Sequence, residues 1–96
     1  MPKFEDPLES QFAQEAALSF AIAGRKLRSA LDRLHAFDVN PTEGVNREEL
    51  IAIAGEAFWC YVVHRETLGL VDAEYIAKEY GVPTEVQRAM GPQKKK

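Results

Sequence analysis

The chain has 96 residues, a formal net charge of −3 and a hydrophobic share of 46%. This length fits one domain, and the apolar share is that of a folded protein, which excludes an intrinsically disordered chain. The negative charge provides no general attraction to nucleic acid or to acidic lipid. A single cysteine excludes an internal disulfide and favours a reducing, cytoplasmic setting. The acidic N terminus is not that of a signal peptide, and no apolar run approaches the roughly 20 residues of a membrane span.

The first predicted helix begins at Asp6 and runs to about Phe37. Asp6 is a suitable N-cap, Pro7 suits the first helical position, and Glu9 completes a capping box. Small and apolar residues recur along this helix at alternating spacings of four and three, which is the pattern of a helix-packing seam. We predict that this seam pairs with a second copy of the chain, with the two helices crossing near Gly24. The residues of the predicted self-association seam are Ala13, Ala17, Phe20, Gly24 and Leu27.

Charge is unevenly distributed along the same helix. Acidic residues lead it, and its second half carries the basic residues Arg25, Lys26, Arg28 and Arg33. This order suits the helix macrodipole. We interpret the basic residues as a solvated face, because they are spread around the helix and Asp32 can pair with Arg28.

A loop and a second helix follow. Residues 38–44, with the sequence DVNPTEG, predict the loop from their turn-forming residues. The second helix is predicted to begin at Asn46, with Glu49 as its capping partner, and to end at Gly69. Its FWCYVV segment also suits a strand, but the helix-forming residues on both sides favour a helix. Apolar residues occupy most of its faces, so we expect it to be covered on more than one side.

The C-terminal part predicts two short helices. Asp72 is the expected N-cap of the first, which ends at Gly81, and one or two further turns lie between Pro83 and Met90. The predicted fold is therefore all-α, a long antiparallel helical hairpin with two short C-terminal helices packed on it. We expect a single helical domain over residues 1–96, with flexible ends at 1–6 and 92–96. One hairpin cannot cover both the seam and every apolar face of the second helix, so we predict a homodimer.

Three segments together resemble a family of small bacterial proteins that is classified only as a domain of unknown function. The segments are AGRKLRSAL, EAFWCYVVHRETLGL and YGVPTEVQRAMG. The resemblance extends from about Glu9 to Gly91 and is most specific between Trp59 and Asp72. It implies a small helical protein without a known activity, so it assigns no functional residue.

Glu56, Cys60 and His64 form a candidate polar site in the second helix, because a spacing of four lets all three face one way. A cysteine and a histidine one turn apart can share a zinc ion, with a glutamate as a further ligand, or act as a nucleophile and its base. No second pair of ligands is present, and apolar surroundings make a thiol inert. We therefore predict no metal, no cofactor and no enzymatic activity. A metal- or thiol-dependent activity at Cys60 and His64 is kept as an alternative.

The same candidate site extends to Arg65 and Glu66. With Asp72, these two residues predict an ion-pair cluster that holds the second helix against the third.

Residues 72–91 carry another alternative, a nucleic-acid-binding regulator. The sequence IAKEYGV followed by Val86 resembles a helix-turn-helix motif. The chain is acidic, and the reading helix offers Glu85 beside a single Arg88, so nucleic acid is an unlikely partner. The favoured prediction is a non-enzymatic, homo-oligomeric interaction module that binds itself and secondarily another protein.

Overall fold

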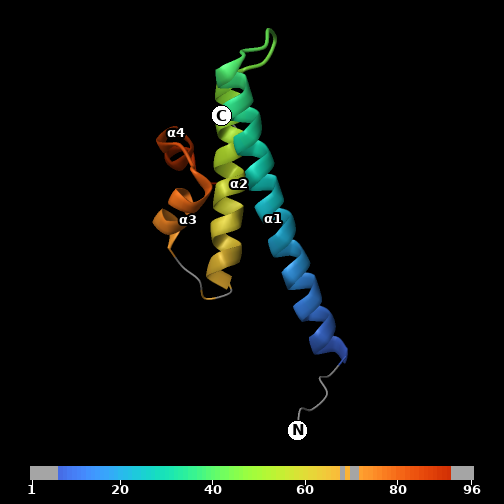
Figure 1. Ribbon diagram of the computed structural model, residues 1–96. Helices are drawn as coiled ribbons and strands as arrows, with labels where there is room; N and C mark the ends of the chain where they lie inside the picture. The colour runs from blue at the N-terminus through green and yellow to red at the C-terminus, as the bar shows by residue number, and fades with distance from the viewer. Residues whose placement is uncertain (1–6, 68, 70–71, 92–96) are drawn as a thin grey trace.

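The computed structural model describes residues 7–67, 69 and 72–91, and of residues 7–10, 12 and 13 only the backbone. This part of the chain forms four helices and no strand: α1 (Pro7–Val39), α2 (Arg47–Thr67), α3 (Ala73–Tyr80) and α4 (Thr84–Arg88). The predicted all-α fold is confirmed. α1 and α2 form a long antiparallel hairpin, and α3 and α4 lie together on one side of α2 (Figure 1).

The first helix extends two residues further than predicted. The amide of Asn40 still donates to the carbonyl of Ala36 at 2.9 Å, so the helical bonding continues into the predicted loop. Pro41 then ends the helix, because proline disfavours the helical conformation of the residue before it. The predicted cap at Asp6 lies outside the described residues.

Three other predicted helix ends are confirmed by their hydrogen bonds. Asn46 Oδ1 accepts from the amide of Glu48 at 2.9 Å at the start of α2. Asp72 Oδ1 accepts from the amide of Tyr75 at 3.3 Å at the start of α3. Gly81 ends α3 in the left-handed conformation, with φ 67° and ψ 42°, and its N–H donates to the carbonyls of Ala77 and Lys78. These local signals therefore fix where the helices start and stop.

All four helices contribute to one hydrophobic core. The largest fully buried side chains are Leu27 in α1, Phe58 in α2, Ile76 in α3 and Val86 in α4. Burying a side chain of this size stabilises the fold by roughly 1.5–3 kcal/mol. The short C-terminal helices are thus held by their apolar faces against the hairpin.

Gly55 in α2 allows the end of α4 to lie directly on the helix backbone. A Cβ atom built at this position would lie 2.5 Å from the carbonyl oxygen of Ala89. Any other residue would therefore push the C-terminal helices away from α2.

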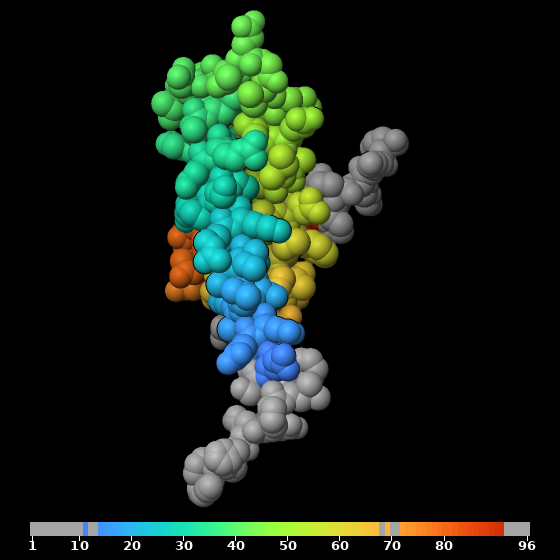
Figure 2. Space-filling model, turned by 90° about the vertical axis from the view of Figure 1, so that its right-hand side faces the viewer, coloured from blue at the N-terminus to red at the C-terminus, as the bar shows by residue number. Residues whose placement is uncertain are grey.

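The N-terminal part of α1 extends past the end of α2 (Figures 1 and 2). Phe20 is the first described side chain, counted from the N terminus, that packs against the core. Every described side chain before it is exposed, and Leu18 is 58% exposed. We call residues 7–19 the projecting segment. None of the described helices has the combined length and hydropathy of a membrane-spanning segment.

Candidate functional site

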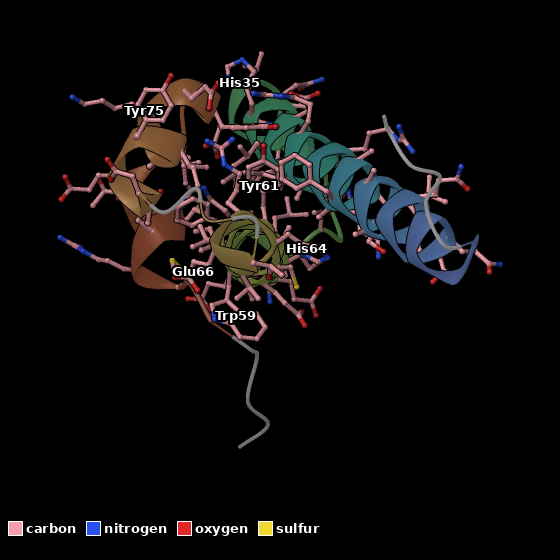
Figure 3. The ribbon with its side chains drawn as sticks, turned by 90° about the horizontal axis from the view of Figure 1, so that it is seen from below. His35, Trp59, Tyr61, His64, Glu66 and Tyr75 are labelled. Carbon is pink, nitrogen blue, oxygen red and sulfur yellow. The ribbon has the colours of Figure 1, made fainter. Side chains whose placement is uncertain are left out.

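A groove of about 860 Å³ runs between α1 and α2. It lies on the face of the hairpin away from α3 and α4, as the position of His64, one of its lining residues, shows (Figure 3). α1 and α2 supply its two walls. The lining residues are Ser19, Ile22, Ala23, Arg25, Lys26, Ser29, Ala30 and Arg33 from α1, and Ile53, Glu56, Ala57, Cys60 and His64 from α2.

The groove has an apolar floor and one basic wall. Ala23 and Ala30 are buried at its base, while Ile22 and Ile53 remain 39% and 44% exposed. On the α1 wall, Arg25, Lys26 and Arg33 are exposed and have no ion-pair partner among the described residues. Among the described lining residues, the one acidic side chain, Glu56, lies on the α2 wall.

Three of the predicted polar-site residues, Glu56, Cys60 and His64, line this groove. The Nδ1 atom of His64 lies 2.8 Å from the backbone carbonyl oxygen of Cys60. Because a carbonyl oxygen only accepts, this contact places the ring proton on Nδ1. The imidazole is thus held by its own helix rather than by the thiol.

Metal-ligand side chains are not clustered in the described part of the chain. No group of three or more histidine, cysteine, aspartate or glutamate side chains there is placed to hold a metal ion. Glu56 is exposed one turn before Cys60, which is half-buried. The absence of a metal and of a cofactor stays a prediction.

The predicted cluster of Arg65, Glu66 and Asp72 is wrong. Arg65 Nη1 donates to the hydroxyl of Tyr61 at 3.3 Å and lies 4.0 Å from Oε1 of Glu79. Glu66 is exposed and points to a different side of α2 from His64 (Figure 3). Asp72 is exposed and already caps α3. Arg65 therefore faces the α3 side of the molecule and takes no part in the groove.

The predicted self-association seam is divided by the structure. Leu27 is fully buried in the chain's own core, and Phe20 stacks on Tyr61 with ring centroids 5.2 Å apart. A Cβ atom at Gly24 would lie 3.3 Å from Tyr61 Cε1 and 3.4 Å from Tyr80 Oη. The predicted crossing of two α1 helices at Gly24 does not fit this packing, because α2 and α3 of the same chain already cover that position.

The other part of the seam lies in the projecting segment. Ala17 is exposed, and Ala13 lies on the same helix with its side chain outside the described residues. Of the helices that the structure describes, none lies beside α1 along most of this segment (Figure 1).

An aromatic cluster joins α1, α2 and α3 on the side away from the groove. Tyr80 meets Tyr61 edge-on with centroids 5.1 Å apart, and the guanidinium of Arg28 lies 5.0 Å from the Tyr80 ring centroid. Burial, followed by hydrogen bonding with Tyr61, raises the pKa of Tyr80 to about 12. These contacts hold α1, α2 and α3 together, because each ring or guanidinium packs against a side chain of a neighbouring helix.

An ion-pair network around Arg47 was not expected from the sequence. Arg47 Nε donates to Asp38 Oδ1 at 2.7 Å, and Arg47 Nη2 donates to Glu85 Oε1 at 3.0 Å. These hydrogen bonds hold the pKa values of both carboxyl groups below their ordinary values. The network connects the end of α1, the start of α2 and α4. Its members are 9 and 38 residues apart, so no local sequence signal identifies them.

Residues 72–91 pack on the hairpin through one face, and the rest of their surface is exposed. The second helix of the proposed motif, α4, has five residues. Its Val86 is fully buried, and its Glu85 pairs with Arg47. The other four residues of α4 are exposed, so nucleic-acid binding through this helix stays an alternative prediction.

No protein-family model, no curated protein and no solved structure matches the chain.

Proposed function

We propose that this chain is a non-enzymatic interaction module that binds a second copy of itself through the groove between α1 and α2. The observation that carries the proposal is the groove itself, an apolar channel between two helices on the face that α3 and α4 leave open. Exposed apolar surface rimmed by polar residues is typical of protein interfaces.

The groove has the form that accepts a helix. Two antiparallel helices make its walls, and the small residues Ala23, Ala30 and Ala57 line it. Small side chains let a third helix approach closely, while Ile22 and Ile53 supply apolar contacts at the rim.

The chain also supplies a helical segment whose described side chains are all exposed. The projecting segment has 13 residues of α1, and an isolated helix of this length is marginal in water. Each copy therefore offers one uncovered groove and one uncovered helical segment. Association of two copies satisfies both, which favours a second copy over an unrelated partner.

The proposal is non-enzymatic because the hydrogen bond of the His64 ring goes to a backbone carbonyl and not to the thiol of Cys60. Glu56 is exposed to solvent. A cytoplasmic setting is part of the same proposal, on the ground that the only cysteine is a free thiol.

A charged substitution in the groove tests this function. Ile22→Asp places a carboxylate among the apolar groove residues, and a two-fold dimer contains that change twice. We expect the dissociation constant to rise by at least about a hundredfold, because each copy loses the apolar contacts of Ile22 and has to desolvate a carboxylate in their place. The measurement is the mass in solution by light scattering over a dilution series.

Val39→Asp is the matched control. Val39 is also an apolar residue of α1, but it is 71% exposed and does not line the groove. We expect this variant to associate like the wild type. A dimer that survives Ile22→Asp unchanged would show that the groove is not the interface.

A further inference from the structure

One exposed stripe of α1 changes character along its length. Its positions follow each other at steps of three or four residues and therefore share one face of the helix. In chain order these residues are Glu15, Leu18, Ile22, Lys26, Ser29 and Arg33, all of them exposed. The stripe is acidic at its N-terminal end, apolar at its centre and basic at its C-terminal end.

We propose that two copies pair through antiparallel α1 helices, with the projecting segment of each copy lying in the groove of the other. This inference rests on the proposed function and adds to it the segment that binds, its direction and its register. In this register Leu18 of each copy lies opposite Ile22 of the other, near the two-fold axis. Glu15 then lies opposite the basic residues Arg25 and Lys26.

Charge decides the direction of the pair. A parallel arrangement in register would place Glu15 against Glu15 and Lys26 against Lys26, and like charges repel. The antiparallel arrangement places each acidic end against a basic end. It also gives Arg25 and Lys26 an acidic partner, which they lack among the described residues of their own chain.

Length agrees with this arrangement. The lining residues of α1 extend from Ser19 to Arg33, which is about 21 Å at the rise of an α-helix. The projecting segment spans about 18 Å on the same measure, so it fills most of the groove without passing the hairpin loop.

The two walls of the groove orient the incoming helix. The basic residues lie on the α1 wall, whereas Glu56 lies on the α2 wall. Glu15, at the acidic end of the stripe, is therefore attracted to the α1 wall and repelled from the α2 wall. The two α1 helices therefore contact each other directly. A two-fold axis makes this contact symmetric, so that each residue pair occurs twice in the dimer.

A charge exchange tests the register. Glu15→Lys and Lys26→Glu each replace an attraction by a repulsion at two symmetric places in the dimer. We expect each single variant to raise the dissociation constant about tenfold, and the double variant to return it to within about threefold of the wild type. The dissociation constant is measured by sedimentation, with helix content checked by circular dichroism.

The control is a double variant with the same net charge. Lys78 is an exposed basic residue of α3 and does not line the groove. Glu15→Lys with Lys78→Glu should therefore associate as weakly as Glu15→Lys alone. If Lys26→Glu itself weakens association, the test remains valid even where Glu15→Lys loses helix content.

The outcomes separate this inference from the proposed function. A wild type that stays a single chain refutes both. If the wild type dimerises and neither Glu15→Lys nor Lys26→Glu weakens the dimer, the antiparallel register is refuted and self-association stands. The same holds if Lys78→Glu restores the association of Glu15→Lys as well as Lys26→Glu does.

Discussion

Gly24 and Gly55 lie inside helices, and an added Cβ atom would have different effects at the two positions. At Gly55 an added Cβ would meet the backbone of Ala89, which cannot rotate away. At Gly24 it would meet the outer atoms of the Tyr61 and Tyr80 rings, which can shift by a few tenths of an ångström. Both glycines lie inside helices, where alanine is intrinsically better by about 1 kcal/mol. Packing, rather than helix propensity, therefore decides which glycine is needed.

Gly55→Ala is expected to destabilise the fold by about 1–3 kcal/mol, because the contact 2.5 Å from the Ala89 carbonyl oxygen forces α4 to move. Gly24→Ala is the matched substitution, and its free energy of unfolding should stay within about 0.5 kcal/mol of the wild type. Urea unfolding followed by circular dichroism measures both. Equal stability of the two variants would show that α4 does not rest on Gly55.

At the level of elements, the ends of the helices were predictable and their tertiary contacts were not. Asn46, Asp72 and Gly81 act on amides or carbonyls a few residues away, so their roles can be read from neighbouring sequence. The bond between Arg47 and Glu85 joins residues 38 apart and exists only after α4 has docked. A pairing of this kind depends on the path of the chain rather than on any local pattern.

The candidate site shows the same division. Periodicity identified the seam of α1 and placed Cys60 and His64 on one face of α2, which is where the groove lies. Periodicity could not show where α2 ends beside α1. Because α2 ends before the N-terminal part of α1, Gly24 and Leu27 are covered by their own chain and Ala17 is exposed. The basic wall was interpreted as a solvated face because its position beside an apolar channel is visible only in the fold.

The Arg47 network predicts how the docking of α4 depends on pH. Asp38 and Glu85 have pKa values below their ordinary values of 3.8 and 4.5, chiefly because Arg47 donates hydrogen bonds to them. Groups with lowered pKa values add stability above those ordinary values, and this stability is lost as the pH falls through the folded-state values. Arg47→Met should therefore unfold more easily than the wild type at pH 7, and the difference should shrink below about pH 4.

Thermal unfolding from pH 7 to pH 2 measures that difference. Lys78→Met removes one positive charge from α3. Because Lys78 has no ion-pair partner among the described residues, this variant should leave the pH dependence unchanged. A constant gap between Arg47→Met and the wild type down to pH 2 would mean that the two carboxylates do not contribute through Arg47.

At the scale of the whole molecule, the single chain is unusually extended. Its radius of gyration is 16.4 Å, whereas a compact domain of 96 residues has about 12.5 Å. The excess comes from α1, whose projecting segment has no cover from the other helices (Figure 1). Together with the open groove, this shape is what is expected of half of a symmetric assembly.

Sedimentation equilibrium of the wild-type protein, over a dilution series at physiological salt, tests the central claim of self-association most directly. We predict a mass of twice the chain's 10.8 kDa at high concentration, falling toward one chain on dilution. A mass of 10.8 kDa that persists even at concentrations of about 100 μM would contradict self-association.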